Sequence, residues 1–265
     1  MPKERKVVLV TGASSGIGFA CAKAFCAQGF GVWGLSRRGL APDGVKAIPA
    51  DVTDQKSVAD AIERVVCEEG GLDILVNCAG SGISGAVEFT PPESSAFQID
   101  VNLLGTANVC REAIPHLRKS KGVIINITSV AASLAIPFQT WYSASKAALN
   151  SYSAALANEL RPFGVRVCAL MPGDIKTGFT SARSKCPEGD SVYGGRISRS
   201  VSKMERDEEN GMSPERVAKK VLRLASRRHL PPSATVGAGY ALLVYLGRVL
   251  PPRLVNRVLY ALYAK

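Results

Sequence analysis

Tyr142 and Lys146 are the two side chains of this sequence best suited to moving a proton. They lie four residues apart in the run Tyr142-Ser143-Ala144-Ser145-Lys146, and a helix places residues at this spacing on one face. A phenol has a pKa of about 10, and a nearby cation lowers that pKa by favouring the phenolate. Because many surface helices contain the same spacing by chance, the interpretation depends on the residues that accompany the pair.

A glycine-rich turn near the start of the chain is the first of these. Thr11–Gly18 reads TGASSGIG and directly follows the strand-like run Lys6–Thr11. Gly12 permits a tight turn, while Gly16 and Gly18 let a diphosphate approach the backbone and the start of a helix. An ordinary turn between a strand and a helix can have this composition, but the position after the first strand favours a dinucleotide site.

The residues at the end of the second predicted strand indicate which dinucleotide binds. A carboxylate here typically holds the adenosine ribose of NAD, whereas Arg accommodates the 2′-phosphate of NADP. The sequence reads Leu35-Ser36-Arg37-Arg38 with no acid. Guanidinium groups bind phosphate through paired, charge-assisted hydrogen bonds. Two arginines in an exposed turn are the alternative, but the missing acid predicts NADP(H) as the cofactor.

Strand-like and helical segments alternate along the chain as far as Met171. Apolar, β-branched runs predict strands at Lys6–Thr11, Gly31–Ser36, Lys46–Asp51, Leu72–Asn77, Val123–Ser129 and Val165–Met171. The segments between them predict helices at Ile17–Gln28, Asp54–Glu69, Pro92–Lys119 (kinked at Pro115) and Thr140–Arg161. This alternation predicts an α/β fold, a Rossmann-type doubly wound parallel sheet flanked by helices, in a single domain over residues 1–265.

Polar and small residues follow the predicted strands at the edge where such sheets bind ligands. Ligands lie at the carboxyl ends of parallel strands. Gly12, Ser36, Asn77, Ser129 and Pro172 all fall at predicted strand ends, and Ser129 precedes Tyr142 by 13 residues. We therefore expect these residues and the Tyr142–Lys146 pair to face one crevice.

Composition excludes several other classes of protein. The 265 residues are 46% apolar, enough for one well-buried domain. Seven scattered cysteines without a Cys-x-x-Cys pair predict neither disulfides nor a metal site, and the N-terminus lacks a secretory pattern, so we expect a cytoplasmic protein. The net charge of +11 comes from dispersed Lys and Arg. Without an RNA-binding aromatic motif it predicts no nucleic-acid partner, and membrane contact is the minority interpretation of this charge.

The pattern changes after Pro172. Residues 178–212 are rich in Ser, Gly, Arg and Lys and predict a mobile substrate loop with one helix, followed by a helix from Ser213 to about Arg228. The tail, residues 240–265, is strongly apolar. Its run Tyr240–Leu250 has 11 residues before two prolines, whereas a membrane-spanning helix needs about 20. No span is therefore expected.

Beyond the prolines the tail predicts an amphipathic helix with Arg253, Asn256 and Arg257 on its polar side. The opposite, apolar face comprises Leu254, Val255, Val258, Leu259 and Leu262. We expect this face to pack on the parent fold or on a partner subunit. The alternative is peripheral membrane contact, in which a basic amphipathic end lies on the lipid surface.

In this order and at these spacings, the motifs resemble the short-chain dehydrogenase/reductase family. The likeness covers about residues 5–180 and rests on Thr11–Gly18, Asp51-Val52, Asn77-Cys78-Ala79-Gly80, Asn102, Ser129, Tyr142, Lys146 and Pro172-Gly173 with Thr177. Cys78 departs from the family, which more often has a second Asn there. Within the family, residues 102–180 are most similar to reductases like the 17β-hydroxysteroid dehydrogenases and acyl-dihydroxyacetone-phosphate reductases.

The resemblance implies hydride transfer between a nicotinamide and a carbonyl or alcohol carbon. Tyr142 is then the acid or base, Ser129 the donor to the substrate oxygen, and Lys146 the group that lowers the pKa of Tyr142 and holds the nicotinamide ribose. Asn102 positions a water that links Lys146 to solvent. The implied cofactor-binding residues are Gly12, Ser14, Ser15, Gly16, Ile17, Gly18, Ser36, Arg37, Arg38, Asp51, Val52, Asn77, Ala79, Gly80, Tyr142, Lys146, Pro172, Gly173, Ile175 and Thr177.

The sequence defines the substrate and the oligomeric state less closely than it defines the cofactor. The apolar segment Ala131–Phe138 predicts an aliphatic or alicyclic carbonyl, such as a steroid- or lipid-like ketone. Oxoacyl thioesters, quinones and small ketones remain alternatives. The resemblance also implies a homodimer or homotetramer packed through Pro92–Lys119 and Thr140–Arg161, although the apolar side chains of the second segment (Leu149, Tyr152, Ala155 and Leu156) fit its own sheet equally well.

Other functional classes fit the sequence less well. A serine hydrolase needs a base, and His116 and His229 belong to no nucleophile motif. A non-catalytic NADPH-binding regulator would be expected to lose Tyr142 or Lys146, and both are present. A membrane- or nucleic-acid-binding module is suggested only by the charge and the apolar tail.

Overall fold

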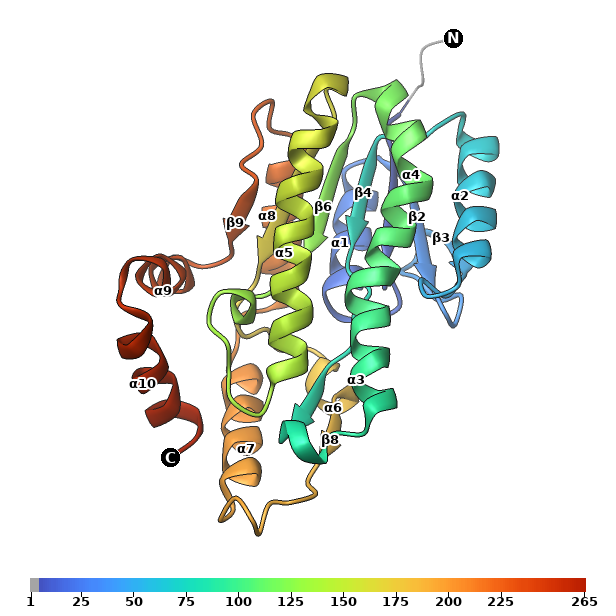
Figure 1. Ribbon diagram of the computed structural model, residues 1–265. Helices are drawn as coiled ribbons and strands as arrows, with labels where there is room; N and C mark the ends of the chain where they lie inside the picture. Colours follow the sequence, from blue (N-terminus) through green and yellow to red (C-terminus); the bar gives the residue numbers. More distant parts are fainter. Residues whose placement is uncertain (1–4) are drawn as a thin grey trace.

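A seven-stranded parallel β-sheet crosses the protein in the computed structural model, which describes residues 5–265 (Figure 1). The strands in sheet order are Lys46–Pro49 (β3), Gly31–Ser36 (β2), Val7–Thr11 (β1), Ile74–Asn77 (β4), Val123–Ile127 (β6), Arg166–Met171 (β7) and Ser233–Thr235 (β9). The chain winds outward in both directions from β1 and β4, which makes the gap between them a switch point. The predicted doubly wound α/β fold is confirmed, and β9 is an edge strand that the sequence pattern missed.

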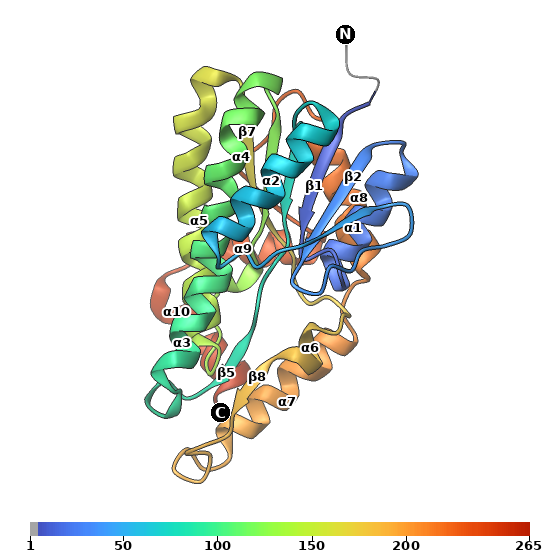
Figure 2. The same ribbon diagram turned by 90° about the vertical axis from the view of Figure 1, so that its right-hand side faces the viewer.

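Both faces of the sheet are buried beneath helices (Figure 2). Along β1, Val8 and Val10 pack toward Gly16–Ala27 (α1) and Pro214–Ala225 (α8). Val7 and Leu9 point to the other face, because side chains alternate along a strand. That face is covered by the helices Gln55–Glu69 (α2), Thr106–Ser120 (α4) and Thr140–Leu160 (α5). Two apolar cores, one on each face, hold the strand ends in register.

The predicted helix Pro92–Lys119 is interrupted, but not at Pro115. It consists of Pro92–Ile99 (α3), a π-helical segment Asp100–Gly105 (η2) and then α4, which runs through Pro115. A π-helical turn contains an extra residue and often marks a functional position. Here it carries Asn102, which is fully buried.

A smaller lobe lies beyond the carboxyl edge of the sheet (Figure 2). Ile83–Gly85 (β5) pairs in parallel with Ser184–Cys186 (β8), and the helices Phe179–Ala182 (α6) and Arg196–Glu209 (α7) surround the pair. The prediction of a loop with one helix at 178–212 was therefore wrong, because this segment holds two helices and a strand. The cause is apolar burial: Ile197 and Val201 of α7 pack with Ala86.

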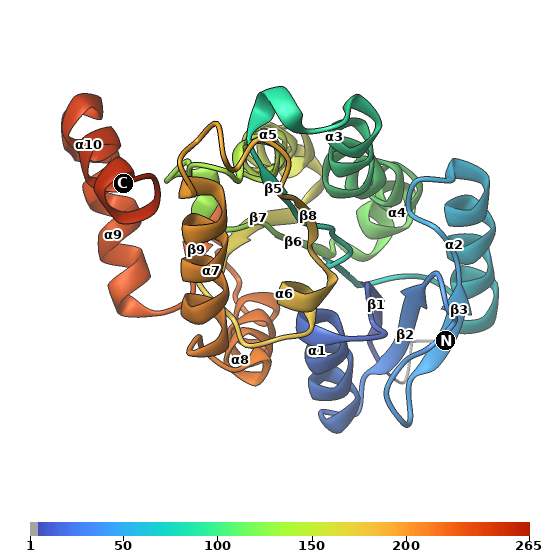
Figure 3. The same cartoon turned by 90° about the horizontal axis from the view of Figure 1, so that it is seen from below.

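The tail forms two further helices, Ala238–Val249 (α9) and Pro252–Tyr263 (α10), at one side of the molecule (Figures 1 and 3). Among the helices of residues 5–265, none is both long and apolar enough to cross a bilayer. Each tail helix buries a single residue, Val244 or Leu259. Of the two alternatives expected for the tail, packing on the parent fold is therefore wrong for most of its side chains, and packing on a partner subunit stays a prediction. Short helical turns elsewhere are Val87–Phe89, Val130–Ala132 and Arg161–Phe163.

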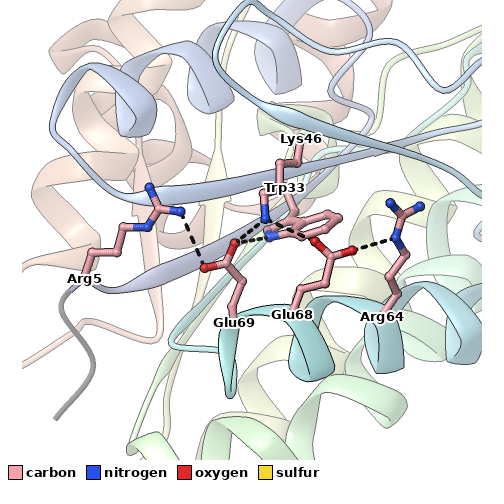
Figure 4. Close-up of polar contacts among 6 residues, drawn as sticks. All are labelled: Arg5, Trp33, Lys46, Arg64, Glu68 and Glu69. Atoms are coloured by element: carbon pink, nitrogen blue, oxygen red, sulfur yellow. Dashed lines mark hydrogen bonds and ion pairs between the residues drawn. The ribbon is translucent and has the colours of Figure 1, made fainter. Parts of the chain in front are cut away.

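Trp33 of β2 is fixed by a cluster of charges at the end of α2 (Figure 4). Its indole N–H donates to Glu69 at 3.1 Å, and Lys46 donates to the same carboxylate oxygen at 3.0 Å while lying 4.6 Å from the ring centroid. Arg5 pairs with the other oxygen at 3.6 Å. Burial raises the pKa of Glu69, but the hydrogen bonds from Lys46 and Trp33 outweigh it and leave this pKa below its usual value.

We expect Glu69→Ala to lower the free energy of unfolding by about 1–3 kcal/mol, because it leaves the buried Trp33 N–H without an acceptor. Glu69→Gln keeps an acceptor and should cost less. Glu63→Ala, at an exposed position of the same helix, is the control. Since the pKa of Glu69 is lowered on folding, its contribution is present above about pH 4.3 and falls at lower pH. Urea unfolding at several pH values measures both effects. An equal loss in the free energy of unfolding for Glu63→Ala and Glu69→Ala would show that Glu69 does not stabilise the protein through Trp33.

Candidate active site

A cavity of about 940 Å³ opens at the carboxyl ends of the strands, across the switch point of the sheet. One end is lined by the glycine turn after β1 and by the residues that follow β2. The other end reaches the smaller lobe and the tail. Nearly every residue predicted for the site lines this cavity: Gly12, Ser14, Ser15, Gly16, Ile17, Gly18, Ser36, Arg37, Arg38, Asp51, Val52, Ala79, Gly80, Ser129, Tyr142, Lys146, Pro172, Gly173, Ile175 and Thr177.

The glycine turn has a backbone that other residues would not adopt. Gly12 has φ +67°, and a Cβ there would lie 2.9 Å from the amide nitrogen of Ala79. A Cβ on Gly18 would collide with the carbonyl of Gly12. The turn leads directly into α1, whose first turn contains no acidic side chain. This arrangement fits a dinucleotide diphosphate, because the free N–H groups and the dipole at a helix N-terminus favour an anion.

The two arginines after β2 stand at the outer end of the cavity and are exposed. Arg38 donates to the Ser14 hydroxyl at 3.4 Å, which directs it toward the glycine turn. Ser36 both donates to the Leu40 carbonyl (2.9 Å) and accepts from the Leu40 N–H (3.0 Å), so its hydroxyl shapes the loop. The residues therefore fit an additional phosphate on the adenosine ribose.

Tyr142 and Ser129 meet on the cavity wall. Ser129 follows β6, where its hydroxyl accepts from the Ala131 N–H at 3.1 Å, so its own proton is free to be donated. Withdrawal of the phenol from solvent raises the pKa of Tyr142 to about 12, although a hydrogen bond with Ser129 acts in the opposite direction. The expectation that this pKa is lowered is therefore wrong for the structure without bound cofactor, and Tyr142 holds its proton at neutral pH.

Lys146 is a buried cation with few partners. The residue is 6% exposed, and its ammonium donates to the Ile127 carbonyl at 3.1 Å and lies 5.8 Å from the Tyr142 ring centroid. It takes part in none of the ion pairs found among residues 5–265. Burial lowers the pKa of Lys146 to about 8. A buried ammonium of this kind fits a ligand that brings hydroxyl acceptors or negative charge, such as the ribose and phosphates of a dinucleotide.

Two predicted site residues lie behind the cavity wall. Asn102 donates to Ser145 at 3.0 Å and to the Ser81 carbonyl at 3.1 Å, and accepts from the Ser81 N–H at 2.8 Å. A Cβ on Gly80 would lie 3.2 Å from the Asn102 oxygen and 3.6 Å from Lys146 Nζ, so Asn102 and Lys146 are close. Asn77 donates to Asn126 at 2.9 Å. This side-chain hydrogen bond joins β4 to β6, so Asn77 lies at the junction of these two strands.

The far end of the cavity contains residues that the sequence motifs did not identify. They are Phe97, Ile136, Gln139, Phe179, Met204, Glu208 and Tyr263. Phe179 packs on Tyr142 with ring centroids 5.8 Å apart. Glu208 accepts from Thr180 at 2.6 Å and pairs with the buried Arg183. Ile136 and Gln139 lie in the loop before α5, and the other five come from α3, α6, α7 and α10. Residues from such separate segments follow no short motif.

Comparison with known proteins agrees with this geometry. The model of the family described as short chain dehydrogenase matches residues 6–187. The chain therefore belongs to the short-chain dehydrogenase/reductase family, and it is an oxidoreductase acting on carbonyl or alcohol groups. It is 39% identical to the 3-ketodihydrosphingosine reductase of Bacteroides thetaiotaomicron over 236 residues, which is 88% of this chain and 88% of that protein.

Solved structures share the whole architecture. A short-chain dehydrogenase from Streptomyces avermitilis superposes with a TM-score of 0.84 at 29% identity, over 98% of this chain and 96% of that one. A 3-ketoacyl-(acyl-carrier-protein) reductase from Brucella melitensis, with NADH bound, has a TM-score of 0.75 at 27% identity, with 89% of this chain and 98% of that one covered. ElxO with NADP bound has a TM-score of 0.73 at 26% identity, with 90% and 99% covered. A nicotinamide cofactor follows from the family.

We expect Lys146→Met to stabilise the cofactor-free protein by about 1–3 kcal/mol near pH 7, because it removes a charge that folding desolvates. Since the folded pKa of about 8 lies below that of the unfolded chain, the wild type gains stability as pH rises from about 8 to 10.5. The advantage of the variant should shrink over that range.

Lys176→Met, at an exposed position near the cavity rim, is the matched control and should leave stability unchanged at every pH. Chemical unfolding of both variants without cofactor checks the expectation. A less stable Lys146→Met protein would show that the ammonium contributes favourable interactions beyond its hydrogen bond to Ile127.

Proposed function

We propose that this protein is an NADPH-dependent reductase of an apolar, lipid-like ketone, with Tyr142 as the proton donor. The observation that carries the proposal is the convergence of Tyr142, Ser129 and Lys146 on one wall of the cavity, directly beside apolar side chains. The Bacteroides relative is named a 3-ketodihydrosphingosine reductase, and this name supports a lipid ketone as the substrate. Steroids and acyl-dihydroxyacetone phosphates belong to this class as well.

The far end of the cavity favours a substrate with an apolar body and a polar group. Phe97, Phe179 and Met204 offer apolar contact, which suits an alkyl or ring system. Glu208 is the carboxylate on the same wall. Both of its oxygens already have partners, Thr180 and Arg183, so Glu208 is a polar part of this wall that an added hydroxyl or amino group of a substrate could also contact.

The proposed mechanism follows from the positions of three side chains. NADPH supplies the hydride that reaches the carbonyl carbon. The Ser129 hydroxyl donates to the carbonyl oxygen as negative charge develops there. Tyr142, which holds its proton at neutral pH, transfers it to the same oxygen. The Lys146 ammonium then stabilises the phenolate, and the Asn102 amide holds the surrounding backbone at Ser81 and, through Ser145, the helix that carries Tyr142 and Lys146.

NADPH should be preferred over NADH by about 10- to 100-fold in kcat/KM, because a charge-assisted hydrogen bond to the extra phosphate contributes about 1.5–3 kcal/mol. Arg37→Ala and Arg38→Ala should each raise the KM for NADPH and leave that for NADH nearly unchanged. Arg161→Ala, an exposed arginine at the end of α5, is the control. Equal kcat/KM for the two cofactors in the wild type would overturn the assignment.

Tyr142→Phe should reduce kcat by at least about 100-fold, since positioned proton transfer contributes 10²- to 10⁴-fold. NADPH binding, measured by fluorescence, should persist because the ring remains. Ser129→Ala should lower kcat without removing the acid. The substrate for these assays is identified by a screen of long-chain ketones, steroids, acyl-dihydroxyacetone phosphates, quinones and 3-oxoacyl thioesters. Activity of Tyr142→Phe close to that of the wild type would place the acid elsewhere.

We further propose a homodimer or homotetramer. Leu149 and Leu156 of α5 are buried against their own sheet, so they are not available for contact. The same helix exposes small residues that would permit close helix packing: Ala144, Ala147, Ala154 and Ala155. Phe97 and Leu104, 48% and 50% exposed on the neighbouring helical segments, add apolar area to this side.

A further inference from the structure

The two tail helices carry an apolar surface that is unlike the rest of the molecule. Among residues 5–265, sixteen large apolar side chains are exposed, and nine of them lie in the tail. They are Leu242, Leu243, Tyr245, Val249, Leu250, Leu254, Val258, Tyr260 and Leu262. A contiguous patch of this kind on a soluble domain usually marks a contact with a membrane or another protein.

The tail helices lie at one side of the molecule, where a few of their side chains attach them to the fold (Figures 1 and 3). Tyr240 and Val244 of α9 pack with Val130 and Met171. In α10, Leu259 is buried, and the Tyr263 hydroxyl donates to Asp207 of α7 at 3.2 Å. The predicted apolar face of α10 is therefore divided: Leu259 turns inward, whereas Leu254, Val258 and Leu262 remain exposed.

The charge of the tail indicates the kind of surface that it fits. From Arg216 to Lys265 the sequence contains no Asp or Glu. Within the two helices and the last residue, the charged side chains are Arg248, Arg253, Arg257 and Lys265. Basic side chains beside exposed Leu, Val and Tyr are typical of helices that lie in the interface of an anionic bilayer. A second copy of this chain is a poorer partner, because a twofold contact would place these like charges together.

The tail also reaches the catalytic cavity. Tyr263, near the end of α10, lines the cavity together with Met204 and Glu208 of α7. The ring of Tyr240 packs so closely on Gly173 that a Cβ there would collide with it. Gly173 lines the same cavity, on the side proposed for the cofactor. The tail therefore forms part of the wall of the cavity in which Tyr142 lies.

We propose that α9 and α10 form a docking surface for an anionic membrane, held so that the catalytic cavity opens toward the lipid. The side chains of Leu254, Val258 and Leu262 enter the interface, and Arg253 and Arg257 contact lipid phosphates. Only the supply of substrate from the bilayer rests on the proposed function. Membrane binding itself does not.

Flotation of the full chain with vesicles tests the docking surface without any use of activity. The wild type should float with vesicles of phosphatidylglycerol and phosphatidylcholine and remain at the bottom with phosphatidylcholine alone. Leu254→Asp combined with Val258→Asp should abolish flotation. Phe163→Asp combined with Val192→Asp adds the same two charges at apolar sites outside the tail, 47% and 72% exposed, and should float normally.

The charges are tested separately. Arg253→Gln combined with Arg257→Gln should weaken binding to the anionic vesicles by about 5- to 30-fold, since each basic residue near such a surface contributes about 1 kcal/mol. The effect should diminish at high salt. Circular dichroism and NADPH fluorescence establish that each variant is folded. A wild type that fails to float, or a tail variant that floats equally well, overturns the proposal.

Two further measurements separate this proposal from its alternatives. If the Leu254 and Val258 variant instead becomes smaller by sedimentation, and the wild type does not float, the surface is a contact between copies of this chain. With a long-chain ketone as substrate, the variant should lose turnover in vesicles and retain it in detergent micelles. Absence of turnover with every carbonyl, while flotation persists, would reject the proposed function and leave the docking surface in place.

Discussion

The burial of one ammonium group, that of Lys146, is the constraint on which the catalytic wall depends. A cation taken out of water needs acceptors, and the protein supplies the Ile127 carbonyl at 3.1 Å and no ion-pair partner within residues 5–265. A Cβ on Gly80 would lie 3.2 Å from the Asn102 oxygen, so the glycine keeps the space beside Asn102 and Lys146 open.

The π-helical turn carries a second connection of this region. Within it, the Asn102 amide binds both the N–H and the carbonyl of Ser81. Its remaining donor bond reaches Ser145, next to Lys146 in α5. One side chain thus joins the loop after β4 to the helix that carries Tyr142 and Lys146.

The sequence predicted where the strand ends and the glycine turn lie better than it predicted the helices at the other end of the cavity. Strand ends and glycines obey local rules: Gly12 needs a positive φ, and Ser129 must follow a buried strand. The sequence therefore placed both correctly. Phe179, Glu208 and Tyr263 meet only through tertiary packing of α6, α7 and α10, for which no short spacing exists. The acidity of Tyr142 was misjudged for a related reason, because withdrawal from solvent outweighs its nearby favourable partners and only the fold reveals it.

Two tyrosines of the tail bind carboxylates at or next to the cavity wall. Tyr240 donates at 2.7 Å to Asp174, which directly follows Pro172 and Gly173. Burial raises the pKa of Asp174, while the hydrogen bond from Tyr240 favours its ionised form. Tyr263 makes the corresponding bond to Asp207, which also pairs with Lys203 at 2.9 Å.

Each tail helix is thus tied by one phenol to a carboxylate beside the cavity. A shift of α10 on a lipid surface must move Tyr263 and, through Asp207, the helix α7 that carries Met204 and Glu208. A shift of α9 must act on Asp174 and Gly173. Through Tyr240 and Tyr263 the tail therefore contacts both the segment that follows β7 and the helix α7.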